Sequence, residues 1–488
     1  MSADLPLPHA PYREQHRPQL HYTPARHWVN DPNGLIVVNG VYHLFYQHNP
    51  HADVPGHLSW GHAISSDLLH WAEQPVALVA RENHMIFSGS AVTDWHNTSG
   101  LGDGSRPPLI ALYTGHADDH PQRQHLAQRH HQAQFLAHSN DGGQTWKAGP
   151  EAVLDLNRAD FRDPKVFWDE ARRRWVMLAV HPDERQIEFF HSDNLHVWTS
   201  LSLFGPTGNL AGIWEVPDFF PLTDENGQER WVLKVDFNPG GPYGGSGAQY
   251  WVGDFDGVAF TPLTDARPLE GGKDFYAALS FSDLPGRRVW LAWMNNWQYA
   301  QWLPTFPWRG SFTVPRELTL GSHLRLIQRP VSELKALRNR TLPLTWPGDA
   351  NPVTFPLCGK HAHELQARLT LQEGQMVRFE FLSVAGIEGT LEVGPTGLSL
   401  IRPDHAPSLS GWGGVHRAPF PEAAAELDLQ LFLDTSSLEV FAAHGQVVIT
   451  DLLLPAAPIT TLKIVGDGHQ VVLEATLYEL HSIWRQGD

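Results

Sequence analysis

Four acidic residues stand at comparable places in a pattern that recurs along the chain. Each opens, or comes just before, a short apolar run: Asp31 in "NDPNG", Asp163 in "FRDPK", Glu215 in "IWEVPD" and Asp274 in "GKDFYA". A further run has hydroxyls there, beginning with Ser88 of "FSGS". Carboxylates held together repel one another, and such a cost usually marks a functional site. The group could bind a divalent cation, or cleave a glycosidic bond with one acid as nucleophile and another as proton donor.

Aromatic residues around these acids favour a sugar over a cation. Flat rings stack on sugar faces, whereas a cage of oxygen ligands has no need of them. The aromatic residues of these motifs are Trp28, Trp60, Phe87, Trp214, Tyr276, Trp293 and Trp297. The chain contains no EF-hand or HExxH pattern. We therefore expect a carbohydrate site without a metal or cofactor.

The elements that must position these acids form a repeat. Its clearest members are apolar, β-branched and aromatic, as strands are. They are "NGVYHLFYQ" (39–47), "RPPLIALYTG" (106–115), "RRRWVMLAV" (172–180), "RWVLKVDF" (230–237) and "RRVWLAWMN" (287–295). Each follows another strand candidate, which begins near one of the acids or serines. Five units of several strands predict a five-bladed β-propeller over residues 1–328, with a large sandwich as the alternative. In a propeller the first strand of each blade lines the central channel, so the acids would converge at one end.

The pattern changes after the fifth unit. "RPVSELKALRNR" has the composition of a helix and predicts a linker helix over residues 329–344. From residue 345 to 488 short alternating runs are separated by frequent turns, which is typical of a β-sandwich. The predicted fold is therefore all-β, a five-bladed propeller followed by a C-terminal sandwich.

Composition limits the partners and the compartment. The 488 residues are 42% apolar, which indicates a globular protein too long for one ordinary core. A net charge of −18 argues against nucleic acid or an anionic membrane as partner. No apolar run is long enough for a membrane helix, and the first residues lack a secretory pattern. With Cys358 as the single cysteine, these features favour the cytoplasm. The oligomeric state has no signature in the sequence.

The motifs "WVNDPNG", "FSGS", "FRDPK", "WEVPD", "DFYA" and "PREL" together resemble glycoside hydrolase family 32, the β-fructofuranosidases. The resemblance covers the whole chain and implies that Asp31 is the nucleophile and Glu215 the acid/base. It also implies that Asp163, with Arg162, grips fructose hydroxyls and stabilises the transition state. The remaining residues of the implied fructose pocket are Asn30, Gln47, Phe87, Ser88 and Trp297.

This assignment makes electrostatic demands. Asp31 must be ionised to attack, whereas Glu215 must carry a proton near neutral pH. We expect crowding by other carboxylates and by Trp214 to raise a carboxyl pKa, and Arg162 to keep Asp163 charged.

Two positions depart from the family's pattern. Val216 stands where most relatives have cysteine after the acid/base. Pro55 stands where many relatives have a tryptophan, so that Val54 or Trp60 would rebuild that wall. Both departures bear on kinetics and pH optimum, not on the class of reaction.

Within the family, "NPGGPYGGSGAQYWVGDFDG" (238–257) and "WMNNWQYA" (293–300) look like the exo-inulinase and levanase branch. The resemblance therefore implies a retaining exo-β-fructosidase acting on levan, inulin, fructo-oligosaccharides and sucrose. A sucrose invertase or a fructosyltransferase of the same family is the first alternative. A fructan-binding protein that lost catalysis is disfavoured by the retained Asp31, Asp163 and Glu215, and a five-bladed arabinan-cleaving hydrolase by "NDPNG".

Overall fold

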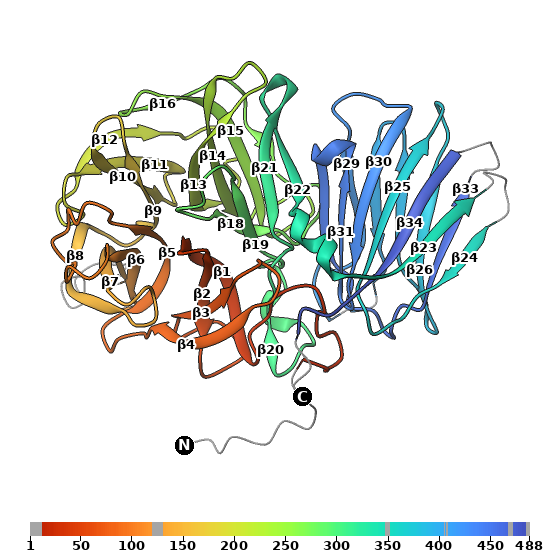
Figure 1. The fold of residues 1–488 in the computed structure, drawn as a ribbon, viewed down its shortest axis with the longest axis horizontal. Coiled ribbons are helices and arrows are strands. Elements are labelled where there is room, and N and C mark those ends of the chain that lie inside the picture. Colours follow the sequence, from red (N-terminus) through yellow and green to blue (C-terminus); the bar gives the residue numbers. More distant parts are fainter. Residues whose placement is uncertain are drawn as a thin grey trace.

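The computed structural model of the protein describes residues 12–119, 130–346, 352–404, 406, 408–466 and 472–484. The expectation that the chain starts without a secretory pattern rests on its first residues, and residues 1–11 lie outside the described ranges. The described chain folds into a ring of five sheets and, beside it, two further sheets face to face (Figure 1). This confirms the predicted propeller and sandwich. No described helix has the length and apolar character that a membrane crossing requires.

Each blade is an antiparallel sheet whose strands follow chain order. Blade one contains β1 (His27–Val38), β2 (Val41–Asn49), β3 (Ser59–Ser65) and β4 (Ala72–Leu78). Blade two contains β5 (Met85–Thr93), β6 (Leu109–Ala117), β7 (His131–Ser139) and β8 (Lys147–Arg158). Blade three contains β9 (Arg162–Asp169), β10 (Arg174–His181), β11 (Gln186–Ser192) and β12 (Thr199–Phe204).

Blade four contains β13 (Ile213–Thr223), β14 (Glu229–Asn238), β15 (Gly247–Phe255) and β16 (Phe260–Pro262), with β17 (Arg267–Pro268) paired to β15. Blade five contains β18 (Tyr276–Ser280), β19 (Val289–Trp293), β21 (Arg316–Gly321) and β22 (Arg325–Pro330). The short strand β20 (Trp308–Arg309) leaves blade five and pairs parallel with the start of β1, which closes the ring.

The five apolar repeats of the sequence are the second strands β2, β6, β10, β14 and β19. A second strand packs against the neighbouring blade on both faces, so it is nearly continuously apolar rather than alternating. In β10, for example, every residue from Trp175 to His181 is buried. Clusters of apolar residues fill each of the five spaces between adjacent blades.

The sandwich consists of two six-stranded sheets. One has the order β23 (Arg338–Trp346), β34 (Val472–Leu480), β25 (His363–Thr370), β30 (Glu426–Leu433), β31 (Ser437–Ala442) and β32 (Val447–Leu452). The other has the order β24 (Val353–Pro356), β33 (Thr461–Gly466), β26 (Val377–Ser383), β27 (Gly386–Gly394), β28 (Gly397–Arg402) and β29 (Gly414–Pro419). Their inner faces enclose one apolar core.

The predicted linker helix over 329–344 differs from what the structure contains. Only a short 3₁₀ helix, η4 (Ser332–Leu337), is present, and β23 begins directly after it. Leu334 and Leu337 are three residues apart and both buried, a spacing that suits the three residues per turn of a 3₁₀ helix. Pairing of β23 with β34 then takes over, so the sandwich begins at Arg338 rather than at residue 345. The described part of the chain has three further 3₁₀ helices, η2 (Ala300–Trp302), η3 (Ser322–Leu324) and η5 (Ala443–Gly445).

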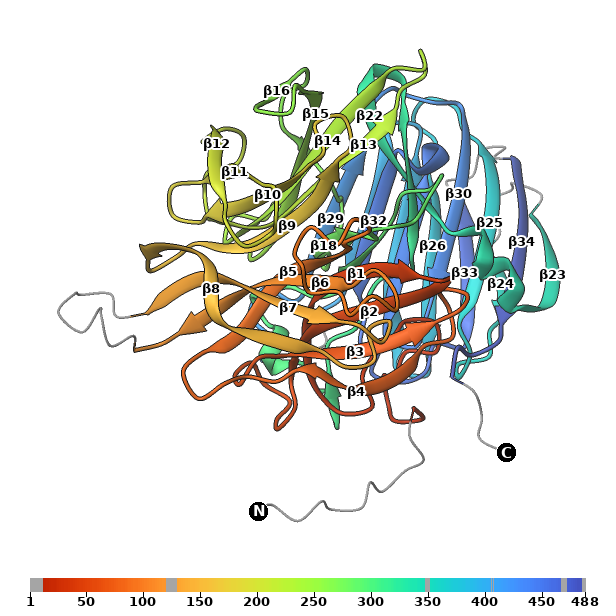
Figure 2. The same ribbon diagram turned by 60° about the vertical axis from the view of Figure 1, so that its left-hand side comes forward.

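Buried ion pairs fasten the sandwich to the propeller. His21 lies between Asp434 and Glu439, 2.8 Å from each. Burial lowers the pKa of His21, but hydrogen bonds to the two carboxylates outweigh it and raise this pKa to about 9, so the ring is a cation. Arg316 of β21 also pairs with Glu439. The sandwich therefore stands beside blade five, as both views show (Figure 1 and Figure 2).

Candidate active site

The first strand of every blade carries the same β-bulge. In each, the first strand advances three residues while its partner advances two, for example from Glu215 to Asp218 against Asp236 to Lys234. A bulge re-aims the side chains around it. The residues just before the bulge are Asn33, Ile86, Arg162, Glu215 and Tyr276.

The bulges are held in a costly backbone conformation. The first bulged residue has a positive φ in four blades, at Gly34 (52°), Asp163 (62°), Val216 (45°) and Ala277 (57°). For residues other than glycine this costs about 1–3 kcal/mol each, and a β-branched valine is a pronounced outlier. Such strain persists only where surrounding contacts impose it, which marks this end of the channel as a site.

Glu215 is gripped by the equivalent residues of the two neighbouring blades. Arg162 Nη2 donates to Glu215 Oε1 at 3.0 Å, and the Tyr276 hydroxyl donates to Glu215 Oε2 at 2.5 Å. The prediction that Asp31, Asp163, Glu215 and Asp274 share one strand position is therefore wrong. The bulge register makes Arg162 and Tyr276 the equivalents of Glu215.

Asp31 occupies a second bulge of β1, between Val29 and Pro32. Its carboxylate accepts hydrogen bonds from Ser88 Oγ at 2.7 Å and Asn30 Nδ2 at 3.0 Å. Burial raises the pKa of Asp31 to about 6; the hydrogen bond from Ser88 opposes this shift and the charge of Glu215 adds to it. A carboxyl with this pKa is ionised at neutral pH and available as a nucleophile.

Asp163 sits at the bulge of β9, and its carboxylate accepts a 2.8 Å hydrogen bond from the backbone N–H of Val216. Burial raises its pKa to about 7, against the effect of Arg162 and assisted by the charges of Glu215 and Asp31. The guanidinium is 3.9 Å from Asp163 but only 3.0 Å from Glu215. Arg162 thus favours the charged form of Asp163, as expected, but burial and the neighbouring carboxylates outweigh its effect.

Lys234 and Asp236 were not identified from the sequence as part of the site. Both are fully buried on β14, where Asp236 pairs in register with Glu215. The Lys234 ammonium donates to the Asp236 carboxylate and to the carbonyls of Val216 (3.0 Å) and Ala278 (2.8 Å), so it ties two bulges together. Burial raises the pKa of Asp236 to about 8, although Lys234 lowers it. The available signal was two charged residues inside the apolar run "RWVLKVDF".

The aromatic residues divide into two groups. The ring centroid of Trp297 lies 5.8 Å from that of Trp28 and 4.9 Å from that of Trp293, and the Trp28 indole donates to Asn30, the neighbour of Asp31. Trp28 and Trp293 are fully buried in the core that blades one and five share, with Trp297 packed against it, whereas Trp60 and Trp214 belong to the cores between other blades. Trp60 therefore does not rebuild the wall at Pro55, whereas Val54 stays exposed.

Two further predicted pocket residues lie on blades one and two. Phe87 stacks on His116, with centroids 4.4 Å apart, and its carbonyl accepts from the Trp60 indole. Gln47 lies beside Asn33, and its buried Oε1 has no hydrogen-bond partner among the residues the structure describes. An unmatched acceptor at the channel suits a hydroxyl donor of a ligand.

Asp274 does not belong to the acidic group. Its carboxylate accepts from the Tyr299 hydroxyl, from Arg402 Nη1 at 2.6 Å and from the backbone N–H of Leu452 at 2.9 Å. Asp274 thus faces the sandwich. The side chain that reaches the site is that of Tyr276, two residues later in the chain.

The acids that remain, Asp31, Asp163 and Glu215, differ in their hydrogen-bond partners. The described part of the chain contains no group of three His, Cys, Asp or Glu that could hold a metal ion. Asp31 is held by neutral donors, whereas Glu215 is held by a guanidinium and a phenol. The two carboxyl groups thus lie in different surroundings, and glycoside cleavage uses one carboxyl as nucleophile and another as acid/base.

Comparison with known proteins agrees with this chemistry. The model of the glycosyl hydrolases family 32 N-terminal domain matches residues 21–330, and that of the family's C-terminal domain matches residues 398–481. The levanase of Bacillus subtilis (strain 168) is 39% identical over 500 residues, covering 97% of this chain and 72% of that protein. An extracellular exo-inulinase of Aspergillus awamori is 34% identical, covering 97% and 96%.

Solved structures lead to the same family. The crystal structure of the exo-inulinase from Aspergillus awamori has a TM-score of 0.88 at 32% identity, covering 97% of this chain and all of that one. A β-fructofuranosidase from Schwanniomyces occidentalis, complexed with fructosyl-erythritol, has a TM-score of 0.87 at 29% identity, covering 97% and 99%. The chain therefore belongs to glycosyl hydrolase family 32 and is a glycoside hydrolase of the fructofuranosidase type.

Proposed function

We propose that the protein is a retaining exo-β-fructosidase that releases terminal fructose from levan, inulin, fructo-oligosaccharides and sucrose. The observation that carries this proposal is the placement of Glu215 between Arg162 and Tyr276, in the same charged cluster as Asp31 and Asp163. Support for a fructan as substrate comes from levanase and exo-inulinase relatives matched over nearly the whole chain.

In the first step, the Asp31 carboxylate attacks the anomeric carbon of the terminal fructose while Glu215 gives its proton to the departing oxygen. The products are a fructosyl ester on Asp31 and the shortened sugar. In the second step, Glu215 takes a proton from water, which attacks the same carbon and frees Asp31. Asp163 and Arg162 bind fructose hydroxyls and stabilise the developing oxocarbenium ion.

The pocket that would hold the terminal sugar joins polar and aromatic side chains from blades one, two and five. Its proposed members besides the acids and Arg162 are Asn30, Gln47, Phe87, Ser88 and Trp297. The glycine-rich segment 240–247 lies at its edge, because Ser246 Oγ accepts a 2.9 Å hydrogen bond from the backbone N–H of Trp297. A pocket at the end of a propeller channel holds one terminal residue, which is why we propose exo cleavage.

Product analysis tests this function. Levan, inulin and sucrose are digested separately and sampled at low conversion by chromatography. We expect free fructose as the early product of the polymers. Early tri- to pentasaccharides would contradict exo cleavage, and cleavage of sucrose alone would make the protein an invertase. Fructose transferred to sugar acceptors at the expense of free fructose would make it a fructosyltransferase.

A further inference from the structure

The sandwich holds the chain segment that leads into β18. The backbone N–H groups of Gly271 and Asp274 donate to the carbonyls of Val448 and Thr450, at 2.9 and 3.0 Å. The Lys273 N–H donates to the Asp451 carboxylate at 2.9 Å. Residues 271–274 thus run along β32 of the sandwich, and Tyr276 follows two residues later.

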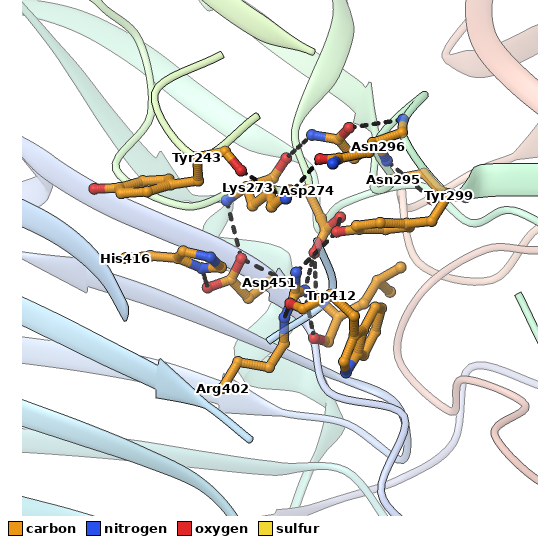
Figure 3. A network of polar contacts seen from close by, with 12 residues as sticks. Tyr243, Lys273, Asp274, Asn295, Asn296, Tyr299, Arg402, Trp412, His416 and Asp451 are labelled. Atoms are coloured by element: carbon orange, nitrogen blue, oxygen red, sulfur yellow. Dashed lines mark hydrogen bonds and ion pairs between the residues drawn. The ribbon is translucent and has the colours of Figure 1, made fainter. Parts of the chain in front are cut away.

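Asp274 is the centre of this contact (Figure 3). Its three partners are Tyr299 of the propeller, and Arg402 and the Leu452 N–H of the sandwich. Arg402 is satisfied in turn: Nη2 donates to the Tyr299 hydroxyl at 2.9 Å, Nε donates to the Trp412 carbonyl at 2.7 Å, and the guanidinium lies over the Trp412 ring. Burying an ion pair is costly unless every group is hydrogen-bonded, so the cluster allows little freedom.

The same cluster fixes the chain on both sides of Trp297. Asn296 Nδ2 donates to the Lys273 carbonyl at 2.9 Å. The Lys273 ammonium donates to Gln298 Oε1 at 2.9 Å and to the sandwich carbonyl of Gly411 at 2.7 Å. Trp297, which packs on Trp28 in the proposed pocket, stands between these two anchored residues.

Domain attachment alone does not require this arrangement. His21 already fastens the domains through Asp434 and Glu439, at contacts that involve neither segment. The cluster of Asp274, Tyr299 and Arg402 differs from these contacts because it lies just before a strained bulge in the chain. Ala277 has a φ of 57°, and the side chain before it, Tyr276, must meet Glu215 at 2.5 Å. A backbone in this conformation needs anchors close by.

We infer that Arg402 and Tyr299 are positioning residues for the reaction: through Asp274 they hold the Tyr276 hydroxyl on Glu215 and, through the adjoining contacts, Trp297 in the sugar pocket. This inference rests on the proposed function. The sandwich is then part of the catalytic apparatus, although none of its described residues forms a hydrogen bond or ion pair with Asp31, Asp163 or Glu215.

The test compares Tyr299→Phe with Thr435→Val. Each removes one hydroxyl between the domains, but Thr435 bonds the Arg17 carbonyl and lies outside the cluster. The measurements are kcat and KM for a fructo-oligosaccharide, whose leaving group needs a proton, and kcat for an activated aryl fructoside, which needs little protonation. Misplacement of a reacting group can cost up to about 100-fold in rate.

For Tyr299→Phe we expect kcat on the oligosaccharide to fall about tenfold or more relative to the aryl fructoside, together with a raised KM. Thr435→Val should keep the wild-type ratio. Arg402→Met should show the same change in ratio more strongly; if it does not fold, Tyr299→Phe decides. A wild-type ratio in Tyr299→Phe, or the same change in Thr435→Val, would overturn the inference. A wild-type protein that releases no fructose would instead refute the proposed function.

Discussion

The Tyr276 hydroxyl and the Glu215 carboxylate, from blades five and four, are joined by a 2.5 Å hydrogen bond. Because a phenol donates only one hydrogen, this contact fixes which oxygen of Glu215 is occupied by Tyr276, while Arg162 holds the other. The orientation of the proposed acid/base thus depends on three blades together.

Removing the phenol should therefore impair proton transfer. We expect Tyr276→Phe to lower kcat/KM on fructo-oligosaccharides about 10- to 100-fold, the range for a lost hydrogen bond to a charged group. Tyr250→Phe is the control, since Tyr250 is also buried but its oxygen accepts from the Leu326 N–H in blade five. Equal losses in the two variants would mean that only packing is affected.

Asp31→Ala should abolish hydrolysis with the fold retained, because water cannot replace a nucleophile at a comparable rate. We expect less than about 1% of wild-type activity in a preparation free of other fructosidases. Asp118→Ala, at an exposed acid of blade two, should remain fully active. Substantial turnover by Asp31→Ala would remove this residue from the nucleophile's role.

Glu215→Gln should still bind substrate and lose most turnover on sugars with poor leaving groups. The first step on an activated aryl fructoside should suffer much less, since its leaving group departs without a proton. Rapid-mixing measurement of released phenolate separates this step from hydrolysis of the ester. If both substrates slow equally, Glu215 is not the proton donor.

The pH dependence should report the ionisation of Asp31. Its pKa of about 6 places the acidic limb of the kcat/KM profile near pH 6, with activity lost as pH falls because the protonated carboxyl cannot attack. Ser88→Ala removes a hydrogen bond that favours the ionised form, so the limb should move to higher pH. The pKa of Asp163 lies in the same range, so the acidic limb could also belong to that residue. Ser88 donates to Asp31 and not to Asp163. An acidic limb that does not move in Ser88→Ala would therefore show that the limb does not report the ionisation of Asp31.

Prolonged treatment with a chelator should leave activity unchanged, because the carboxylates are engaged with donors and serve proton transfer. The measurement is kcat/KM before and after dialysis against the chelator, with and without added calcium. A large loss that calcium restores would mean that an ion contributes to the fold or the site.

The fold was largely predictable from sequence because the second strands are buried on both faces and stand out as apolar runs. Asp31, Asp163 and Glu215 could also be picked out, because acids beside turns and aromatic residues are conspicuous. Strand register was harder. A bulge adds one residue without a compositional signature, so Asp274 was aligned with Glu215 although Tyr276 is its equivalent.

The other differences between the sequence-based predictions and the structure also have local physical causes. Lys234 and Asp236 contact each other inside the protein, and a pair two residues apart in a strand looks like any solvated pair until burial is known. Trp214 resembled a pocket residue because it adjoins Glu215, but alternate side chains of a strand point to opposite faces, and it turns into the core against Trp251. The helical composition of 329–344 was outweighed by pairing with β34.

The closure of the ring has a consequence for the order in which the protein can be made. The start of β1 pairs with Trp308 and Arg309 of β20, and the backbone N–H groups of Gln19 and Leu20 are held by the Asp434 carboxylate. A ribosome reaches these partners hundreds of residues after blade one, roughly tens of seconds later at about 5–20 residues per second. Throughout that interval blade one lacks these contacts, so the nascent propeller remains an open ring until β20 emerges, and residues 19 and 20 gain their partner only when the sandwich follows.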